Sequence, residues 1–291
     1  MRRLKATPYL FTLPFMIAFG LFLIVPIAYA IYLSLFRVVH NGLAPDSTVF
    51  APVANYVRAF SDSDFTTSLL NILKYAIIQV PIMVALATVI ALILDGGEGR
   101  LRRAFRMSVF IPYAIPGVIA GILWSYLYSN NVSPINQLAR QLGFAPINFV
   151  ASALILASVG NIVIWVSTGY NAVILYASLR NIPRELYDAA NIDGATTWQV
   201  IRFVKLPILR PTLLLVLIFS IIGATQIFGE PYILRSLGYV PNNITPNTVI
   251  YNAATTEGNF NYAAALAVSL ALMTFLASGI FLWSTTRERK S

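Results

Sequence analysis

The sequence predicts an all-α integral membrane protein with six transmembrane helices, and three observations lead to that fold class. Hydrophobic residues make up 58% of the 291 residues and charged residues only 11%, whereas soluble domains carry roughly 25% charged residues. The hydrophobic residues form runs of about 20 or more, the length that crosses a bilayer as a helix. The basic residues gather in alternate connecting segments, as the positive-inside rule describes for multi-pass proteins.

The expected spans follow one another within a single transmembrane domain over residues 1–291. Each span is a mainly apolar run between segments that hold charged residues, Gly or Pro. We place the spans at about residues 9–36, 69–94, 107–128, 151–176, 212–233 and 262–284.

The first and third runs carry features beyond hydrophobicity. Ala28-Tyr29-Ala30 resembles a signal-peptidase site, so a cleaved signal peptide is an alternative to span one, but the run is longer than a typical signal segment and continues past that site. Pro14 and Pro26 predict bends in this span. Span three contains Pro112, Pro116, Gly117 and Gly121, and we expect it to be bent or locally unwound. Such irregular backbone is tolerated at membrane depth only where other protein groups or a water-filled cavity provide hydrogen-bond partners for its N–H and C=O groups.

The distribution of basic residues predicts that both termini lie in the cytoplasm. With the N-terminus inside, the outside segments hold only Arg37, Arg58, Arg140 and Arg235, and Lys74 lies at the border. Fifteen basic residues fall inside: Arg2, Arg3, Lys5, Arg100, Arg102, Arg103, Arg106, Arg180, Arg184, Arg202, Lys205, Arg210, Arg287, Arg289 and Lys290. The net charge of +9 therefore reflects basic cytoplasmic segments, and we expect no nucleic-acid partner.

The composition argues against several kinds of chemistry. The chain has no cysteine, and His40 is its single histidine, so a disulfide framework or a Cys/His metal centre is not expected. No G-x-x-x-x-G-K-[ST] loop for binding nucleotide phosphates occurs. We therefore expect neither an enzyme nor a bound cofactor.

The connector between spans four and five, residues 177–211, is unusually long and dense in charge. Pro183 suits the first position of a helix, because that position needs no N–H donor. Gly194 can adopt the left-handed conformation that ends this helix. Thr196 or Thr197 can cap a second helix, which we expect to end before Pro207.

The first of these two short helices should present a small apolar face. Leu186, Ala189 and Ala190 fall at i, i+3 and i+4 and so share one side of the helix. The alanines are small, so another surface can approach closely. An alternative is an amphipathic helix pair that lies on the membrane surface.

The same connector carries a family resemblance. The segment E-L-Y-D-A-A-N-I-D-G-A followed by L-P resembles the EAA loop of ABC importer permeases. The matching positions are Glu185, Ala189, Ala190, Asp193, Gly194, Ala195, Leu206 and Pro207. The preceding Ile-Pro and Trp198 are similar to the carbohydrate-uptake branch, of the maltose and glycerol-3-phosphate type, and the similarity extends over nearly the whole chain. One departure follows span five, where many relatives have T-x-G-G-P and residues 235–246 differ.

The resemblance implies a type I ABC importer permease fold, with cytoplasmic coupling helices between spans four and five. The expected partners are a second, different permease subunit, a cytoplasmic ABC ATPase dimer that binds ATP and Mg²⁺, and an extracytoplasmic solute-binding protein. The solute would be a sugar or a related compound, with a glycerol phosphate compound also possible. The location would be a bacterial cytoplasmic membrane, in contact with lipid. The residues expected to couple the chain to the ATPase are Glu185, Leu186, Ala189, Ala190, Asp193, Gly194, Ala195 and Pro207.

Polar residues within the spans are candidates for contact with the solute, because polar groups at membrane depth are costly. Asn161, Trp165 and Thr168 lie in span four, and Gln226 and Glu230 lie one helical turn apart in span five. Hydrogen bonding between helices, worth about 0.6 kcal/mol each, is the alternative role. Glu230 could also lie at the membrane interface, because it is near the outer end of its span.

Two other functions compete with an ATP-driven importer. An ion-gradient-driven secondary transporter would normally show inverted repeats and charges at the membrane centre, and the sequence shows neither. A membrane scaffold without transport is a third possibility, but that function would not explain a bent span or polar groups within the spans.

Overall fold

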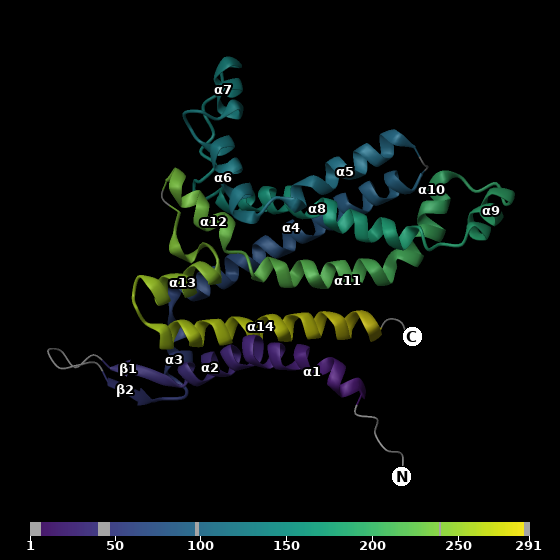
Figure 1. Ribbon diagram of the computed structural model, residues 1–291. Helices are drawn as coiled ribbons and strands as arrows, with labels where there is room; N and C mark the ends of the chain where they lie inside the picture. Colours follow the sequence, from purple (N-terminus) through teal and green to yellow (C-terminus); the bar gives the residue numbers. More distant parts are fainter. Residues whose placement is uncertain (1–6, 40–46, 97–98, 239, 288–291) are drawn as a thin grey trace, which may run out of the picture. The chain divides into compact units, whose positions relative to one another are not determined.

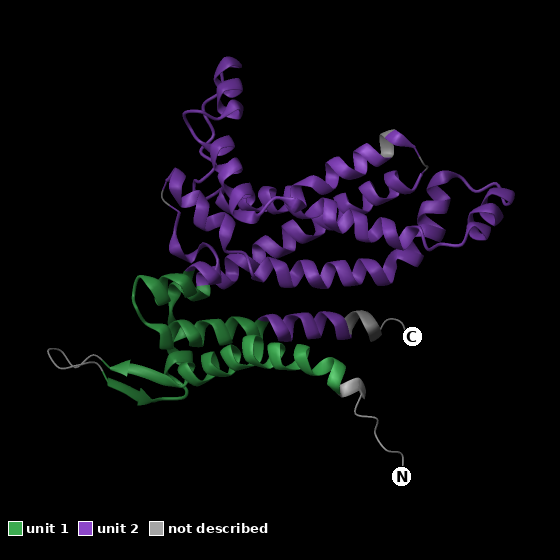
Figure 2. Cartoon of the chain, viewed as in Figure 1, with its two compact units in different colours: residues 1–66, 249–273 green, residues 67–248, 274–291 purple. Residues whose placement is uncertain are grey.

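The computed structural model describes residues 7–39, 47–96, 99–238 and 240–287. The terminal basic residues Arg2, Arg3, Lys5, Arg289 and Lys290, as well as His40, lie outside the described residues. The chain divides into two compact units, which are Met1–Thr66 with Val249–Met273 (unit 1) and Thr67–Thr248 with Thr274–Ser291 (unit 2) (Figure 2).

The described residues form an almost entirely helical protein with six candidate spans (Figure 1). Five helices are long and apolar enough to cross a membrane, and a bent pair can form a sixth span. The five are Leu10–Ser34, Ser63–Asp95, Ile155–Leu179, Thr197–Leu237 and Phe260–Trp283, and the pair is Arg103–Ala114 with Gly117–Tyr128. The predicted helical membrane fold is therefore confirmed.

Unit 1 contains the first span and the start of the last one. The first span comprises α1 (Thr7–Phe19), a π-helical turn (Gly20–Ile24) and α2 (Val25–Ser34). The last is α14 (Phe260–Arg287), whose Asn261 amide donates to the Leu33 carbonyl at 2.9 Å. This bond satisfies a carbonyl in the last turn of α2, where the carbonyl groups have no N–H donor within the helix.

The segment after span one contains structure that the sequence did not predict. Strands β1 (Phe36–Val39) and β2 (Ser47–Phe50) pair antiparallel, with Phe36 opposite Phe50, and α3 (Ala54–Ser61) follows. Buried Asn55 donates to the carbonyls of Ser34 and Phe36 at 3.0 and 2.8 Å. One amide thus fixes α2, the hairpin and α3 to one another.

Unit 2 contains spans two and three. Span two is α4 (Ser63–Asp95), whose first residues belong to unit 1. Span three is the bent pair α5 (Arg100–Ala114) and α6 (Gly117–Tyr128). The two helices of the pair meet at 98°. Ile115, which precedes Pro116, has extended φ and ψ of −81° and 124°, as the proline ring demands of its neighbour. The predicted bend is confirmed. Helix α5 begins at Arg100, before the expected start of span three at about residue 107.

Span four, α8 (Ile155–Leu179), packs closely against α5. A Cβ at Gly169 of α8 would lie 1.8 Å from the Val109 carbonyl oxygen of α5, so only glycine allows this approach. Buried Ile162, Ala172, Leu175 and Leu179 place α8 in the hydrophobic core of unit 2.

The predicted end of the second connector helix before Pro207 was wrong. Helix α10 (Thr197–Val200) continues through a π-helical turn (Ile201–Lys205) into α11 (Leu206–Thr225). The π turn of span one likewise ends two residues before a proline, Pro26. A wider turn at these points relieves the clash of the proline ring with the carbonyl four residues earlier, and the helix can continue.

The remaining helices are short. They are α7 (Pro134–Gln141), α9 (Arg184–Ile192), α12 (Gly229–Leu234), α13 (Pro246–Thr255) and two 3₁₀ turns at Arg235–Leu237 and Asn242–Ile244. Helices α9 and α10 lie beyond the ends of α8 and α11, at the opposite end of unit 2 from α12 (Figure 1). Unit 2 therefore has functional candidates both among its spans and at one end of them.

Candidate functional site

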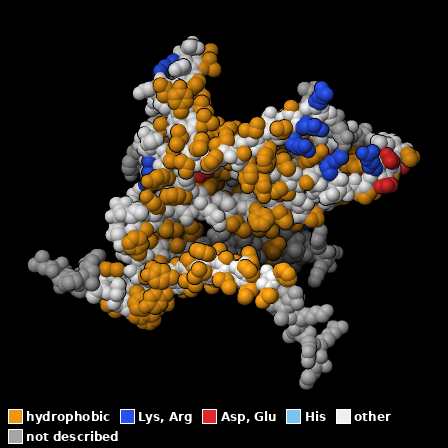
Figure 3. All heavy atoms as spheres, in the orientation of Figure 1, with side chains coloured by type: hydrophobic (Ala, Val, Ile, Leu, Met, Phe, Trp, Pro, Cys, Tyr) orange, Lys and Arg blue, Asp and Glu red, His pale blue; other side chains and the backbone are white. Residues whose placement is uncertain are grey.

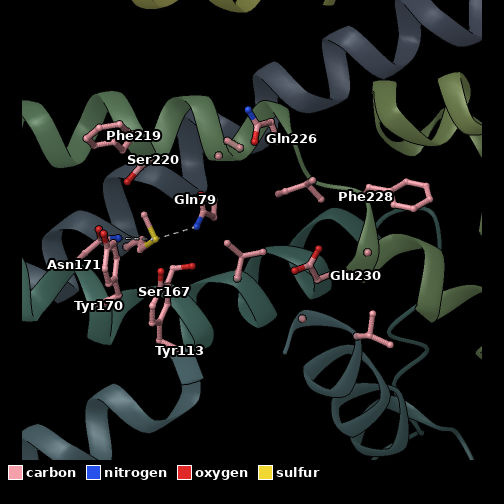
Figure 4. Close-up of a pocket in the computed structure, with 18 residues that line it drawn as sticks. Gln79, Tyr113, Ser167, Tyr170, Asn171, Phe219, Ser220, Gln226, Phe228 and Glu230 are labelled. Carbon is pink, nitrogen blue, oxygen red and sulfur yellow. Dashed lines mark hydrogen bonds between the residues drawn. The ribbon is translucent and has the colours of Figure 1, made fainter. Parts of the chain in front are cut away.

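A pocket of about 610 Å³ lies among the helices of unit 2. Its size is within the range of small-molecule sites. Helices α4, α8 and α11 contribute to its wall, together with residues near the bend of span three and the segment that links α11 to α12 (Figure 4). The lining residues with polar or aromatic side chains are Gln79, Tyr113, Ser167, Tyr170, Asn171, Phe219, Ser220, Gln226, Phe228 and Glu230.

Two buried amides form one polar part of the pocket wall. Gln79 of α4 and Asn171 of α8 are only 4% and 7% exposed. Both donate to the Met83 sulfur, at 3.5 and 3.6 Å, and Figure 4 shows them converging on that atom. Because a thioether is a weak acceptor, these amides can exchange this contact for a better one with a hydroxyl-bearing solute.

Aromatic rings form another part of the wall. Tyr113 of α5 stacks on Tyr170 of α8, with ring centroids 4.3 Å apart and an interplanar angle of 14°. The Phe219 side chain is 64% exposed, and Phe228 lies in the link after α11. The pocket thus combines apolar ring faces with hydrogen-bonding groups.

Gln226 and Glu230 both line this pocket, but not as neighbours on one helix. The prediction that they lie one turn apart on a continuous span was wrong, since α11 ends at Thr225 and α12 begins at Gly229. The Asn247 amide donates to the carbonyls of Thr225 and Ile227, at 3.0 and 3.4 Å. This side chain satisfies backbone groups freed by the break, which makes an interrupted helix tolerable.

The other three predicted path residues do not line the pocket. The Asn161 amide donates to the Tyr128 hydroxyl at 2.8 Å, and Trp165 packs edge-on against Trp124 with centroids 5.8 Å apart. The Thr168 hydroxyl donates to the Ile164 carbonyl at 2.6 Å. For Asn161 the structure therefore shows the alternative role, a hydrogen bond between helices.

Sequence reasoning missed Gln79 and Asn171. Both are polar residues inside apolar runs, so the criterion that selected Gln226 would also have selected them. The aromatic lining carries no such signal, because Tyr and Phe are common throughout the spans.

The second candidate region is the helix pair between spans four and five. Gly194 has the predicted positive φ, 71°. The N–H groups of Gly194 and Ala195 bond to the carbonyls of Asn191 and Ala190, at 3.1 and 2.9 Å, which is the Schellman arrangement for ending a helix. Thr196 caps α10 through a capping box with Gln199. The predicted helix, turn and helix are thus present.

No residue of helix α9 is buried, and only Tyr187 and Ala190 are half-buried. Leu186 and Ile192 are 43% and 87% exposed. A hollow of about 260 Å³ lies between the end of α9 and α10. Its lining residues are Ala190, Asp193, Gly194, Ala195, Gln199, Val200, Phe203 and Val204. Figure 3 shows charged side chains gathered around α9 and over the start of α5, whereas hydrophobic side chains dominate the rest of the visible surface of unit 2.

One polar cluster joins α9 to two spans. The Lys205 ammonium lies 2.6 Å from Oδ2 of Asp95 at the end of α4, with side chains only 11% and 9% exposed. The Tyr187 hydroxyl of α9 donates to the same oxygen at 3.4 Å. Burial, reinforced by the Asp95 carboxylate, raises the pKa of the Tyr187 phenol to about 12, so the hydroxyl keeps its proton near neutral pH.

A helical membrane protein with a polar pocket among its spans and an exposed helix pair at their ends has the features of a transport subunit. The chain belongs to the family described as binding-protein-dependent transport system inner membrane component, whose model matches residues 87–290.

Curated relatives match over most of their length. The arabinooligosaccharides transport system permease protein AraP of Bacillus subtilis (strain 168) is 31% identical, over 96% of this chain and 88% of the relative. The lactose transport system permease protein LacF of Rhizobium radiobacter is 31% identical, over 97% of this chain and 94% of the relative. The trehalose/maltose transport system permease protein MalF of Thermococcus litoralis is 30% identical, over 79% and 77%.

The fold is shared with a solved transporter. A chain of a bacterial ABC transporter involved in the import of the acidic polysaccharide alginate superimposes with a TM-score of 0.82 at 21% identity, covering 97% of this chain and 95% of that one. A chain of the alginate transporter in complex with an alginate pentasaccharide-bound periplasmic protein also gives 0.82, at 20% identity and covering 98% and 96%.

This chain therefore has the type I ABC importer permease fold and is the membrane-spanning permease component of a binding-protein-dependent transporter. It is a transport component and not an enzyme. The alternative of an ion-gradient-driven transporter receives no support from these relatives.

Proposed function

We propose that this chain, with a second and different permease subunit, forms the path by which an ATP-driven importer carries an uncharged sugar across the membrane. The relatives named for arabinooligosaccharides, lactose and trehalose/maltose support a saccharide solute. An extracytoplasmic binding protein would deliver it, as the family description suggests.

The composition of the pocket carries the proposal for an uncharged sugar. Its amide, hydroxyl and carboxyl groups suit a solute with many hydroxyls, and its aromatic rings suit the apolar faces of sugar rings. Among its described lining residues there is no Lys or Arg, and Glu230 supplies a carboxyl group. An anion would lose its hydration without gaining a cationic partner. The pocket therefore disfavours the glycerol phosphate compound that the sequence left open.

Gln226 and Glu230 are the predicted path residues that we assign to solute contact. They flank the break between α11 and α12, so a movement of either helix changes the shape of the pocket. Asn161 and Trp165 would act indirectly, by holding α8 against α6, whereas Thr168 bonds within α8 itself.

The ATPase would be a separate cytoplasmic dimer that binds ATP and Mg²⁺, and this chain would bind neither. Helix α9 would dock on it through Glu185, Leu186, Ala189 and Ala190. The turn at Asp193, Gly194 and Ala195 reverses the chain, and the helix that runs through Pro207 joins the docked segment to span five. Most residues of α9 are exposed, apolar Leu186 and Ile192 among them, which supports a partner there.

This arrangement requires both termini and α9 in the cytoplasm, with the binding protein on the opposite face. The fifteen-to-four distribution of basic residues supports that orientation. Lipid would surround the exposed apolar faces of the spans.

Uptake by the reconstituted complex tests the proposal. The chain is co-expressed with the neighbouring permease, ATPase and binding-protein genes, and the complex is placed in vesicles with ATP inside. We expect ATP-dependent uptake of an uncharged oligosaccharide, but not of a uronic acid oligomer or glycerol phosphate. Uptake that continues without ATP and stops when an ionophore collapses ion gradients would contradict the proposal. The sugar bound to the co-purified binding protein identifies the solute.

A further inference from the structure

Helix α9 is attached to the rest of unit 2 by very few side chains. Tyr187 is the one residue of α9 that packs against the hydrophobic core among the described residues. No residue of α9 is buried. A movement of α9 is passed to the spans only if the connection between them is rigid. This attachment therefore decides whether motion of α9 reaches the spans.

The attachment converges on a single carboxylate oxygen. Oδ2 of Asp95 accepts hydrogen bonds from Lys205 at 2.6 Å and from the Tyr187 hydroxyl at 3.4 Å. The Lys205 ammonium also lies 5.3 Å from the centroid of the Tyr187 ring, within the range of a cation–π contact. Each member of the cluster therefore contacts both of the others.

The three residues belong to three elements that are far apart in the chain. Asp95 is the last residue of α4, Tyr187 lies in α9, and Lys205 ends the π turn that leads into α11. Their contacts thus join span two, the docking helix and span five at one point. The side chains of the ion pair are about 10% exposed, and in such a shielded setting an ion pair is stronger than in water.

We propose that Asp95, Lys205 and Tyr187 are positioning residues that hold α9 to the ends of spans two and five as one rigid body. Displacement of α9 then moves both spans, instead of bending the connector. The π turn before Pro207 is the point that needs this support, because it lies between α9 and α11 and lacks the regular hydrogen bonds of an α-helix. This inference rests on the proposed docking of α9 to the ATPase.

Removal of one partner of the ion pair should uncouple ATP hydrolysis from uptake. In the reconstituted complex we expect Asp95→Asn and Lys205→Met to keep the ATPase bound, while sugar transported per ATP falls roughly three- to thirtyfold, the range for residues that carry coupling. Tyr187→Phe keeps the ring and loses only the long hydrogen bond, so its effect should be smaller. Arg202→Met, at an exposed position of the same π turn, is the matched control and should transport normally.

Restoring the attachment should restore coupling. Reversing the pair, with Asp95→Lys and Lys205→Asp together, should recover part of the transport per ATP. The chain has no native cysteine, so Asp95→Cys with Lys205→Cys can be bridged by a bifunctional maleimide in a complex with cysteine-free partners. We expect the unbridged variant to be uncoupled and the bridged one to regain coupling.

Three results would overturn the inference. The first is normal transport per ATP in both single variants, and the second is no recovery on reversing or bridging the pair. The third is loss of the ATPase from variants that still insert into the membrane, because that loss would assign the cluster to assembly of the complex. Failure of the wild-type complex to link uptake to ATP would instead refute the proposed function, so the two outcomes are distinct.

Discussion

At the scale of single residues, Gln226 and Glu230 are polar groups that the break in the fifth span brings to the pocket. A lost hydrogen bond to a solute costs about 1 kcal/mol, which corresponds to about a fivefold change in an equilibrium. Gln226→Ala and Glu230→Ala should therefore raise the sugar concentration needed for half-maximal uptake, each by about this factor, while ATPase activity is retained.

Asn161→Ala is the comparison for these two variants. Asn161 bonds to Tyr128 and does not line the pocket, so its replacement should leave the concentration dependence unchanged. If both pocket variants transport with an unchanged concentration dependence, their assignment to the solute path is wrong.

Ala189 tests the docking face with one side chain. Its position on exposed α9 leaves room for a bulky residue in the isolated chain, but a close partner surface would be pushed away. Ala189→Trp should insert into the membrane normally, lose the ATPase on purification and lose ATP-dependent uptake. Ala189→Ser, which adds one atom, should keep both. An Ala189→Trp complex that stays assembled and transports at the normal rate would exclude α9 as the coupling element.

At the scale of elements, the contact between α5 and α8 sets the position of the pocket wall. Gly169 sits where a Cβ would lie 1.8 Å from the Val109 carbonyl oxygen. Because that atom belongs to the backbone, the helices must separate to admit even a methyl group, and overpacking of this kind costs about 1–3 kcal/mol or more. Tyr170 and Asn171 follow directly in the chain, so the same change displaces two lining residues.

Gly169→Ala should therefore lower the thermal stability of the purified protein and weaken sugar uptake together. Gly160 lies on the same helix, but there a Cβ would meet its nearest neighbour, Tyr75, at an ordinary 3.5 Å. Gly160→Ala is thus the matched control and should change stability little. Equal melting temperatures for the two variants would show that α5 and α8 are not held as closely as described.

At the scale of the whole molecule, orientation in the membrane decides which surfaces meet which partners. The absence of native cysteine makes labelling direct. A cysteine at exposed Thr197 should react with a membrane-impermeant maleimide only after the cells are opened, whereas one at exposed Asn130 should react in intact cells. The proposed topology is wrong if the cysteine at position 197 is labelled from outside.

The sequence by itself determined the membrane class, the bend of span three and the helix ends around Gly194. These features depend on local properties: the cost of placing polar groups in lipid, the geometry that a proline imposes on the preceding residue, and the freedom of glycine to adopt positive φ. The EAA-like segment could be recognised for a similar reason, since its residues are contiguous.

Only the tertiary structure decided which polar residues share the pocket and which hold the helices together. The break after Thr225 depends on Asn247, which satisfies the freed carbonyls, and Pro207 proved compatible with a continuing helix because a π turn precedes it. Gln79 and Asn171 meet at Met83 although Asn171 is 88 positions away from that residue, and Lys205 is 110 positions from its partner Asp95. Contacts between distant segments arise from packing of the completed helices, and hydropathy along one chain carries no record of them.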